Sequence, residues 1–271
     1  MSGADRVRLD QLLVDRGLVE SRNVARGVIM AGLVKVAGRR EDKAGTFVRP
    51  DAVVDIKERP RFVSRSGEKL AHALVSLEVE PTGVSALDIG ASTGGFVDCL
   101  LQSGAERVIA VDVGYGQLDA RLRSDPRVHV LERVNARRLT PDQLPFEPDF
   151  LTVDVSFISL EKILPAVISC MFPVFTGLLL VKPQFEAGPR SVGKGGIVRD
   201  TAVHAQVLRR IGAFLRSAGL EIAGLCDSGL PGVGGNVEFV YRVDRGRGDG
   251  LSPATLDRLI VTVAQGEEES E

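Results

Sequence analysis

Short apolar runs alternate with helix-sized, more polar stretches from Val84 onward. The first five runs are strongly apolar, as strands buried on both faces of a parallel sheet are. The seven runs cover 84–90, 107–114, 128–132, 149–156, 176–183, 220–226 and 237–243. Helices are expected over 66–79, 94–104, 116–124, 159–172 and 201–218, with a terminal helix after 250. This alternation predicts an α/β domain of doubly wound, Rossmann type, with a seven-stranded and mostly parallel sheet.

The first sixty residues follow a different pattern. Leucines at helical spacing predict a short helix that ends at Gly17, and Ser21 is placed to cap a second one. The expected elements are helices over 8–17 and 21–32, then strands over 33–38 and 51–58 joined by a polar turn. We therefore expect a small α/β domain at 1–59, a linker at 60–64 and the larger domain at 65–271.

The composition excludes several classes of protein. The 271 residues are 44% hydrophobic and 26% charged, which is typical of a folded domain and not of a fibrous or low-complexity chain. Three cysteines without a CxxC pair argue against a disulfide framework or a zinc site, so no metal is expected. The longest weakly polar run, 166–181, is too short for a membrane span and is broken by Pro173 and Gly177. The N-terminus lacks the apolar core of a signal peptide, so a cytoplasmic location is expected.

The small net charge of −2 conceals an uneven distribution. Residues 1–69 carry 15 Lys and Arg against 10 Asp and Glu, whereas the remainder carries 19 against 26. A basic N-terminal segment joined to an acidic remainder favours a polyanionic partner for the basic segment. Arg22 and Arg26 share one helix face, which suits contacts with RNA phosphates. The residues expected to bind RNA are Arg6, Arg8, Arg22, Arg26 and Lys35.

The segment RLDQLLVDRGLVESRNVARGVIMAGLVKVAG, residues 8–38, resembles the S4-type RNA-binding module. Its sequence of helix, Ser-Arg, helix and Gly-x-Val-x-Val is the form of that family. The resemblance implies that the first domain binds RNA. The alternative is a helical docking module without RNA contacts.

A glycine-rich loop, LDIGASTGGF, follows the first strand of the larger domain. Glycines there permit a sharp turn and close approach of a ligand to the backbone. An acid 22 residues after Gly90, Asp112, is placed to accept hydrogen bonds from ribose hydroxyls of NAD or S-adenosylmethionine. The spacing G-x-x-x-G-G differs from that of dinucleotide enzymes, and the loop resembles the S-adenosylmethionine loop of class I methyltransferases. The residues expected at this cofactor are Asp88, Gly90, Ser92, Gly94, Gly95, Phe96, Asp112, Asn135 and Asp154. Phe96 has an equally plausible role in the core.

Charged residues also follow two other strands directly. Asp154 ends the fourth strand and Lys182 the fifth, so both belong to the cofactor edge of a parallel sheet. A charge placed straight after an apolar run indicates a function. Glu238 reaches the same edge if the last strand is antiparallel, and Lys69 lies on the helix before the first strand. By residue type alone, Lys69 and Glu238 are as consistent with a surface role.

The Lys69, Asp154, Lys182 and Glu238 set resembles the catalytic tetrad of FtsJ-type 2′-O-ribose methyltransferases. The whole chain is similar to the TlyA family, also called haemolysin A, which joins an S4-type module to an FtsJ-like domain. The segments that carry this similarity are SRSGEKL, LDIGASTGGF, VDVGYGQL, VLERVNAR, VDVSFISL, VKPQFE and GGNVEF. The resemblance implies S-adenosylmethionine-dependent 2′-O-methylation of cytidines in 16S and 23S ribosomal RNA and susceptibility to capreomycin and viomycin.

In that reaction Lys182 is expected to take the ribose proton as a neutral amine, or to stabilise the developing alkoxide as a cation. Asp154 would orient Lys182, and Lys69 and Glu238 would position the nucleotide and the lysine pair. The expected partner is ribosomal RNA in both subunits, with a monomeric enzyme and no membrane or obligate protein partner. The alternatives are a non-catalytic ribosome assembly factor, a cytolysin, a base methyltransferase and, more remotely, a dehydrogenase.

Overall fold

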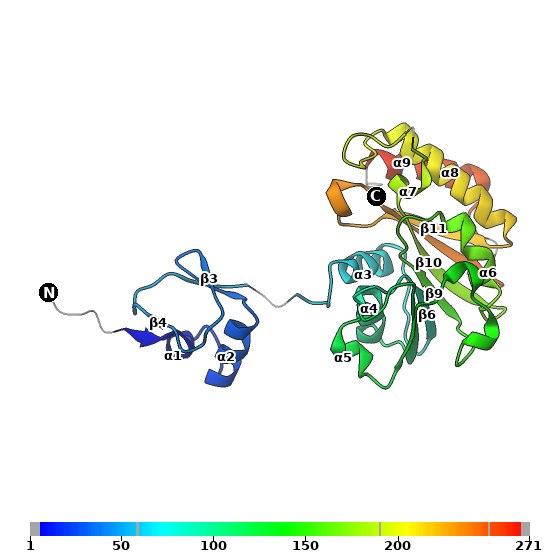
Figure 1. Ribbon diagram of the computed structural model, residues 1–271. Coiled ribbons are helices and arrows are strands. Elements are labelled where there is room, and N and C mark those ends of the chain that lie inside the picture. The colour runs from blue at the N-terminus through cyan, green and yellow to red at the C-terminus, as the bar shows by residue number, and fades with distance from the viewer. Residues whose placement is uncertain (1–5, 58–59, 190, 249, 267–271) are drawn as a thin grey trace. The chain divides into compact units, whose positions relative to one another are not determined.

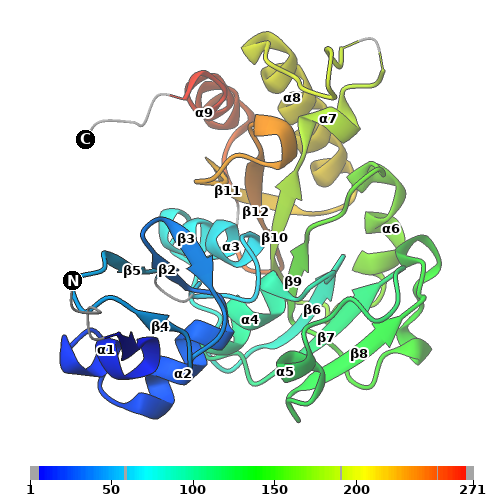
Figure 2. The same ribbon diagram turned by 60° about the vertical axis from the view of Figure 1, so that its left-hand side comes forward.

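The computed structural model describes residues 6–57, 60–189, 191–248 and 250–266 (Figures 1 and 2). The chain forms two compact units, residues 1–60 and residues 61–271, and each is treated by itself. Phe62 is buried in the second unit, and the amide of Val63 donates to Asp98 there. Residues 62 and 63 of the expected linker are therefore packed on the larger unit.

The first unit packs two helices on short strands. Its elements are β1 (Val7–Arg8), α1 (Leu9–Asp15), α2 (Arg22–Met30), β2 (Val34–Val36), β3 (Arg39–Glu41), β4 (Phe47–Val48) and β5 (Val54–Ile56). Strand β1 pairs with β4, and β3, β2 and β5 form an antiparallel sheet. Ser21 caps α2 by accepting a hydrogen bond from the amide of Val24. Leu9, Leu13 and Ile29 are fully buried in the core between the helices and the sheet.

The polar segment 39–50 was expected to be a turn, and this expectation was wrong because it contains β3 and β4. Ala37 and Gly38 both have positive φ, 48° and 77°, as the two central residues of a type I′ hairpin turn do. That turn pairs Val36 with Arg39 and extends the chain into β3. An Ala-Gly pair is a weaker hairpin signal than Asn-Gly, so the pattern of polar residues concealed the strand.

The second unit is a seven-stranded sheet in the order β11-β12-β10-β9-β6-β7-β8. The sheet strands are β6 (Ser85–Ile89), β7 (Arg107–Asp112), β8 (Val128–Glu132), β9 (Phe150–Val153), β10 (Phe175–Val181), β11 (Glu221–Asp227) and β12 (Phe239–Arg245). The helices are α3 (Ser66–Ser76), α4 (Gly95–Gln102), α5 (Ala120–Arg123), α6 (Leu164–Ile168), α7 (Pro183–Glu186), α8 (Thr201–Ser217) and α9 (Pro253–Gln265). Short 3₁₀ turns lie at Ala136–Arg138, Pro141–Gln143, Leu160–Lys162 and Val233–Gly235. The predicted α/β fold with a mostly parallel sheet is confirmed.

Helices cover both faces of this sheet (Figure 1). One apolar layer packs α3, α4 and α5 on the sheet, and the other packs α6, α8 and α9 on the opposite face. Phe175, Phe239 and Tyr241 are fully buried in the second layer. The helix expected over 159–172 is shorter, because a 3₁₀ turn precedes α6 and Pro165 stands in its first turn. Helix α7 was not predicted, since its four residues are too few to show a helical period.

The sheet topology brings the ends of four strands to one edge. Strands β6, β9 and β10 are parallel neighbours, so their carboxyl ends lie together. Strand β12 runs antiparallel to β10 and pairs Val181 with Phe239. The residue that follows β10, Lys182, is therefore close to the residue that precedes β12, Glu238. The antiparallel direction of β12, on which the placement of Glu238 at this edge depended, is thus present.

Candidate active site

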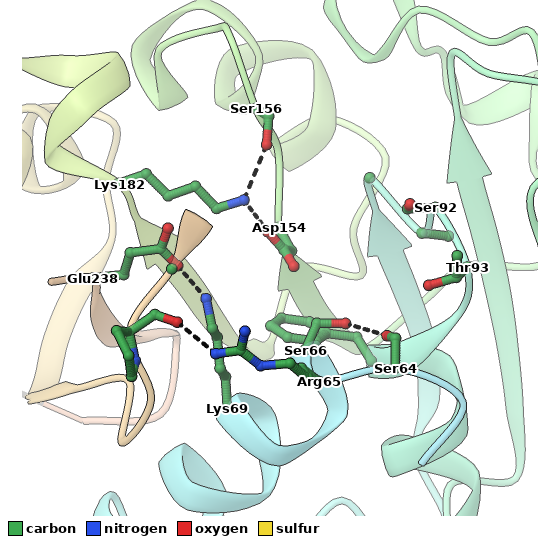
Figure 3. A pocket seen from close by; sticks show the side chains of 15 residues that line it. Ser64, Arg65, Ser66, Lys69, Ser92, Thr93, Asp154, Ser156, Lys182 and Glu238 are labelled. Atoms are coloured by element: carbon green, nitrogen blue, oxygen red, sulfur yellow. Dashed lines mark hydrogen bonds and ion pairs between the residues drawn. The ribbon is translucent and has the colours of Figure 1, made fainter. Parts of the chain in front are cut away.

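A cavity of about 330 Å³, here called the catalytic pocket, opens at this edge of the sheet (Figure 3). Its walls come from the start of α3, the loop after β6, the loop after β9, the end of β10 and the start of β12. Lys69, Asp154, Lys182 and Glu238 all line it. The four residues expected to form a catalytic tetrad are thus brought to one cavity.

Two of the four form a buried ion pair. Lys69 Nζ lies 2.5 Å from Glu238 Oε2, and the two side chains are 10% and 3% exposed. Gln184 Nε2, from α7, donates to the other carboxylate oxygen of Glu238 at 3.0 Å. Gly232 packs against the same carboxylate so closely that a Cβ there would fall within 2.1 Å of Oε1. Both oxygens of Glu238 are therefore engaged, and the negative charge of Glu238 is directed at Lys69.

The other two form a second ion pair nearer the opening. Lys182 Nζ lies 2.5 Å from Asp154 Oδ1, and the side chains are 12% and 17% exposed. Lys182 Nζ also donates to Ser156 Oγ at 3.1 Å. Figure 3 shows the Lys182 side chain reaching from β10 across to the loop after β9, where both partners lie. This lysine remains accessible to a substrate in the pocket, because some of its side chain is exposed.

The loop that supplies Asp154 and Ser156 is held by the residues that follow Lys182. Glu186 accepts hydrogen bonds from the hydroxyl of Ser159 and the amide of Leu160, each at 2.8 Å. Arg210 of α8 donates a hydrogen bond to the same carboxylate of Glu186 at 2.8 Å. Segment 182–186 and loop 154–160 are thus joined at both ends, which fixes the loop relative to the catalytic lysine.

A second cavity of about 540 Å³, here called the nucleoside pocket, shares Gly90, Ser92, Asp154 and Ser156 with the first. Its walls are largely apolar, and Asp112 lies at its polar side. Asp112 accepts hydrogen bonds from the amides of Ser92 (2.8 Å) and Gly114 (2.6 Å). Such a carboxylate is fixed in place and keeps lone pairs for ribose hydroxyls.

Other residues expected at the cofactor occupy several places. Asn135 lines the nucleoside pocket and accepts a hydrogen bond from the amide of Arg137. Phe96 is almost fully buried in the core and also lines the catalytic pocket, and contact between Phe96 and a cofactor stays a prediction. Ser92 lines both pockets and holds a left-handed backbone with φ of 47°.

The glycines of the loop after β6 fall into two groups, one that lines the pockets and one that permits close packing. Gly90, with φ of 89°, lines both pockets, and a Cβ there would fall 2.3 Å from the carbonyl oxygen of Asp154. Gly94 and Gly95 are not among the described residues that line either pocket. A Cβ on Gly94 would meet Leu122, and one on Gly95 would meet the hydroxyl of Ser66. These two glycines allow α4 to start close to its neighbours, and cofactor contact by them stays a prediction.

Asp88 differs from the other acids of the site because it is completely buried in β6. Thr152 Oγ1 donates to Asp88 Oδ1 at 2.6 Å. Asp88 is not among the described residues that line either pocket. Burial, with smaller contributions from the charges of Asp154 and Asp112, raises its pKa from 3.8 to about 7. The pKa of Asp88 is thus close to neutral pH, and direct contact between Asp88 and a cofactor stays a prediction.

The raised pKa of Asp88 predicts a pH dependence of stability. Between pH 3.8 and about 7 the folded state keeps a proton on Asp88 that the unfolded state has lost, so the stabilisation is present below that window and is lost as pH rises through it. We expect Asp88→Asn to remove this loss of stability with rising pH, because an asparagine side chain does not titrate in this range. Thermal melting of the wild type and Asp88→Asn at pH 5 and pH 8 tests it: the melting temperature of the variant should gain on that of the wild type at pH 8. A difference that is the same at both pH values would contradict the expectation.

Three side chains of the site were not singled out from the sequence. Ser156 bonds Lys182, Gln184 bonds Glu238, and Gln117 lines the nucleoside pocket, where it accepts a hydrogen bond from Ser92. Ser156 stands two positions after Asp154, and this position just after a strand was the sequence feature that could have indicated a role in the site. The two glutamines have no such signal, because their roles depend on how neighbouring loops pack.

In the first unit, Arg8 and Arg22 converge on one fully buried acid, Asp10. Arg8 donates to both carboxylate oxygens, at 3.0 and 2.8 Å, and Arg22 Nε donates to Oδ2 at 3.2 Å. The Arg8 guanidinium, helped by Arg22, lowers the pKa of Asp10 to about 2, so Asp10 is charged at neutral pH. Both arginine side chains remain about half exposed.

The other three expected RNA-binding residues lie elsewhere on the same unit. Arg26 is exposed on α2, Arg6 is exposed before β1, and Lys35 is half-buried on β2. Among residues 6–57, 60–189, 191–248 and 250–266, no cluster of three His, Cys, Asp or Glu side chains could hold a metal ion. No helix in these ranges is long and apolar enough to cross a membrane.

Comparisons with known proteins agree with this geometry. Residues 62–245 match the model of the FtsJ-like methyltransferases, and residues 7–54 match that of the S4 domain. YqxC of Bacillus subtilis is 50% identical over 87% of this chain and 85% of its own length. The 16S/23S rRNA (cytidine-2′-O)-methyltransferase TlyA of Mycobacterium tuberculosis is 44% identical over 87% of this chain and 89% of its own. A solved chain from Streptococcus thermophilus is 38% identical, covers 98% of both chains and superimposes with a TM-score of 0.73.

Proposed function

Because this chain belongs to the FtsJ-like methyltransferases, in the TlyA family with its N-terminal S4 domain, we propose that it methylates the 2′-hydroxyl of cytidines in 16S and 23S ribosomal RNA. The observation that carries the proposal is the meeting of two Lys–carboxylate pairs in one cavity that adjoins a nucleoside-sized, largely apolar pocket. S-adenosylmethionine is the proposed methyl donor.

The pockets fit such a donor by their chemistry. The nucleoside pocket offers apolar walls for a purine and Asp112 for its ribose. Gly90 stands where the two pockets join and has no side chain to block a ligand that spans them. When bound, the donor supplies an electrophilic methyl carbon on a sulfonium, and the carboxylate of Asp154 lies in the wall shared by both pockets.

The chain's own residues then have separate tasks. A ribose hydroxyl is a weak nucleophile, so it must be aligned with the methyl carbon and must lose its proton. Lys182 is the group that takes the proton or stabilises the oxygen, since it lines the pocket, is held by Asp154 and belongs to the less buried of the two pairs. The more deeply buried Lys69–Glu238 pair contributes a fixed charge next to it and positions the nucleotide.

The RNA side of the proposal rests on the S4 domain and on the rim of the nucleoside pocket. Phe157 follows Ser156, is 89% exposed and has a left-handed backbone with φ of 64°. Its ring lies 4.7 Å from that of Phe185 between centroids. An exposed aromatic ring in a strained loop provides a surface on which an unstacked base can rest. Across the pocket, Arg137 adds positive charge.

The direct test combines purified full-length protein, labelled S-adenosylmethionine and unmodified 30S and 50S subunits. Primer extension at limiting dNTP locates any 2′-O-methyl group. We expect a ribose stop at a cytidine in each subunit. Label without a ribose stop would indicate base methylation, and tight binding without transfer would favour an assembly factor. Release of haemoglobin from erythrocytes without any transfer would favour a cytolysin.

Several finer proposals accompany this one. The family resemblance supports a cytoplasmic monomer without an obligate protein partner, whose loss lowers susceptibility to capreomycin and viomycin. It also supports a boundary between the RNA-binding and catalytic domains within residues 60–64. Growth with capreomycin in the presence and absence of the protein, and light scattering of the purified chain, test the first two.

The arginine pair on Asp10 gives a prediction for RNA binding. Arg22→Ala should weaken binding to ribosomal RNA similarly across sequences and lower the slope of log affinity against log salt by about 1, because one phosphate contact is lost. Filter binding at several salt concentrations measures both. Arg49→Ala is the matched control, since Arg49 is exposed and paired with Asp51 in the same unit. An Arg22→Ala protein with the wild-type slope would contradict the assignment.

A further inference from the structure

Within the described part of the chain, the amine of Lys182 donates a hydrogen bond to Ser156 Oγ at 3.1 Å (Figure 3). It also lies 2.5 Å from Asp154 Oδ1, as an ion pair without hydrogen-bond geometry. A lysine nitrogen is tetrahedral, and Cε occupies one of its corners. Ser156 takes a second corner, so two corners remain on a nitrogen whose side chain lines the catalytic pocket.

The state of those two corners depends on protonation. A lysine ammonium carries three N–H groups, so it can bond Ser156, face Asp154 and still donate to a substrate oxygen. A neutral amine has two N–H groups and one lone pair. The negative charge of Asp154 repels a lone pair on its side, so the second N–H faces Asp154 and the lone pair is left at the last corner. Without the hydrogen bond to Ser156, rotation about the Cε–Nζ bond would let the lone pair point in more than one direction.

We propose that Ser156 is a positioning residue for methyl transfer, whose oxygen fixes the rotation of Lys182 Nζ and directs its lone pair at the ribose 2′-hydroxyl. This inference rests on the proposed function. In the step, the O–H bond of the ribose breaks and its proton passes to Lys182 Nζ. The oxygen electron pair forms the new bond to the methyl carbon, and the electron pair of the broken carbon–sulfur bond stays on sulfur. The lysine afterwards releases the proton to water.

The position of Ser156 is well determined by its surroundings. The loop is held on one side by Asp154 at the end of β9 and on the other by the hydrogen bonds of Glu186 to Ser159 and Leu160. Phe157, next to Ser156, packs on Phe185. Ser156 itself is exposed, so loss of its hydroxyl removes no core packing.

The other lysine of the pocket lacks this arrangement. Lys69 is paired with Glu238, whose second oxygen is bonded by Gln184. That pair is also more buried than Lys182 with Asp154. Ser156 therefore acts on Lys182, the lysine to which the proposed function assigns the ribose proton.

The test compares Ser156→Ala with Ser156→Thr, which keeps a hydroxyl, and with Ser169→Ala as a matched control. Ser169 bonds the carbonyl of Ala166 at the end of α6. The readouts are the single-turnover rate with saturating ribosomal subunits and S-adenosylmethionine, and the Kd of S-adenosylhomocysteine by calorimetry. We expect Ser156→Ala to slow transfer about 10- to 100-fold, the value of one hydrogen bond to a charged group. Its Kd should stay within about twofold of wild type, because the loss acts on the rate and not on ground-state binding.

The remaining outcomes separate this inference from the proposed function. Recovery of most of the rate in Ser156→Thr supports the inference, and the Ser169→Ala rate should equal that of the wild type. A wild-type rate in Ser156→Ala, or a loss explained entirely by weaker S-adenosylhomocysteine binding, would overturn the role of Ser156 while leaving ribose methylation standing. A wild-type protein that transfers no methyl group to ribose would overturn both.

Discussion

Lys182→Ala should abolish methyl transfer while leaving the binding of both substrates close to wild type. The expected loss in single-turnover rate is on the order of 10²–10⁴-fold, which is the range for removal of a general base or of a group that stabilises developing charge. The effect is large because Lys182 lines the catalytic pocket and is already held by Asp154 and Ser156. Rapid quenching with labelled S-adenosylmethionine and saturating subunits measures the rate.

The control for this variant is Lys162→Ala, which removes an exposed lysine from the 3₁₀ turn at Leu160–Lys162. Its rate should equal that of the wild type. Calorimetry with S-adenosylhomocysteine separates chemistry from binding, since Lys182→Ala should keep the affinity and lose only the rate. A Lys182→Ala protein that retains a tenth or more of the wild-type rate (roughly the loss of one hydrogen bond) would show that Lys182 is not the group that handles the proton.

Gly90→Ala should be the most damaging substitution at the methyl-donor site. The φ of 89° is strained for alanine and costs about 1–2 kcal/mol. In addition, the new Cβ would fall 2.3 Å from the Asp154 carbonyl oxygen, so the loop and the end of β9 must separate. Overpacking of this kind costs about 1–3 kcal/mol more. We expect a total loss of about 2–5 kcal/mol in unfolding free energy and about 10²-fold weaker binding of S-adenosylhomocysteine, because a shift of about 1 Å moves the walls of both pockets.

Gly219→Ala separates the two causes. Gly219 has a φ of 77°, yet a Cβ there would meet no atom within 4 Å. This variant should lose the backbone contribution of about 1–2 kcal/mol and no ligand affinity. Urea unfolding and calorimetry on both variants provide the comparison. Equal losses of stability and unchanged affinity in Gly90→Ala would show that the contact with Asp154 yields without effect on the pocket.

The sequence predicted those parts of the site that depend on strand ends. Each apolar run ends at a definite residue, so the pattern of the chain was sufficient to place Asp154 and Lys182 at one edge of the sheet. Lys69 and Glu238 required the family resemblance, because one lies on a helix and the other precedes an antiparallel strand. Neither the antiparallel direction nor the packing of α3 is determined by local pattern.

The sequence did not predict differences in burial that depend on a shift of one residue along a strand. Asp88 and Asp154 both lie at the end of an apolar run, yet Asp88 is inside β6 and completely buried while Asp154 follows β9 and lines the pocket. Successive side chains of a strand point to opposite faces of the sheet, so a shift of one residue changes the surroundings of an acid. A run that is apolar throughout gives no sign of this alternation. Ser156 and Gln184 were missed for another reason, since their partners lie 26 and 54 residues away in the sequence.

The order of the strands also has a consequence for synthesis. Strand β12 is the last strand made by the ribosome, but it lies inside the sheet, between β10 and β11, and Glu238 immediately precedes it. A nascent or truncated chain that ends before residue 239 has an incomplete sheet in which β10 and β11 each expose a hydrogen-bonding edge. Lys69 has its partner only when this final strand is in place. Termination before residue 239 is thus expected to leave the larger unit without an internal strand of its sheet and to impair the active site at the same time.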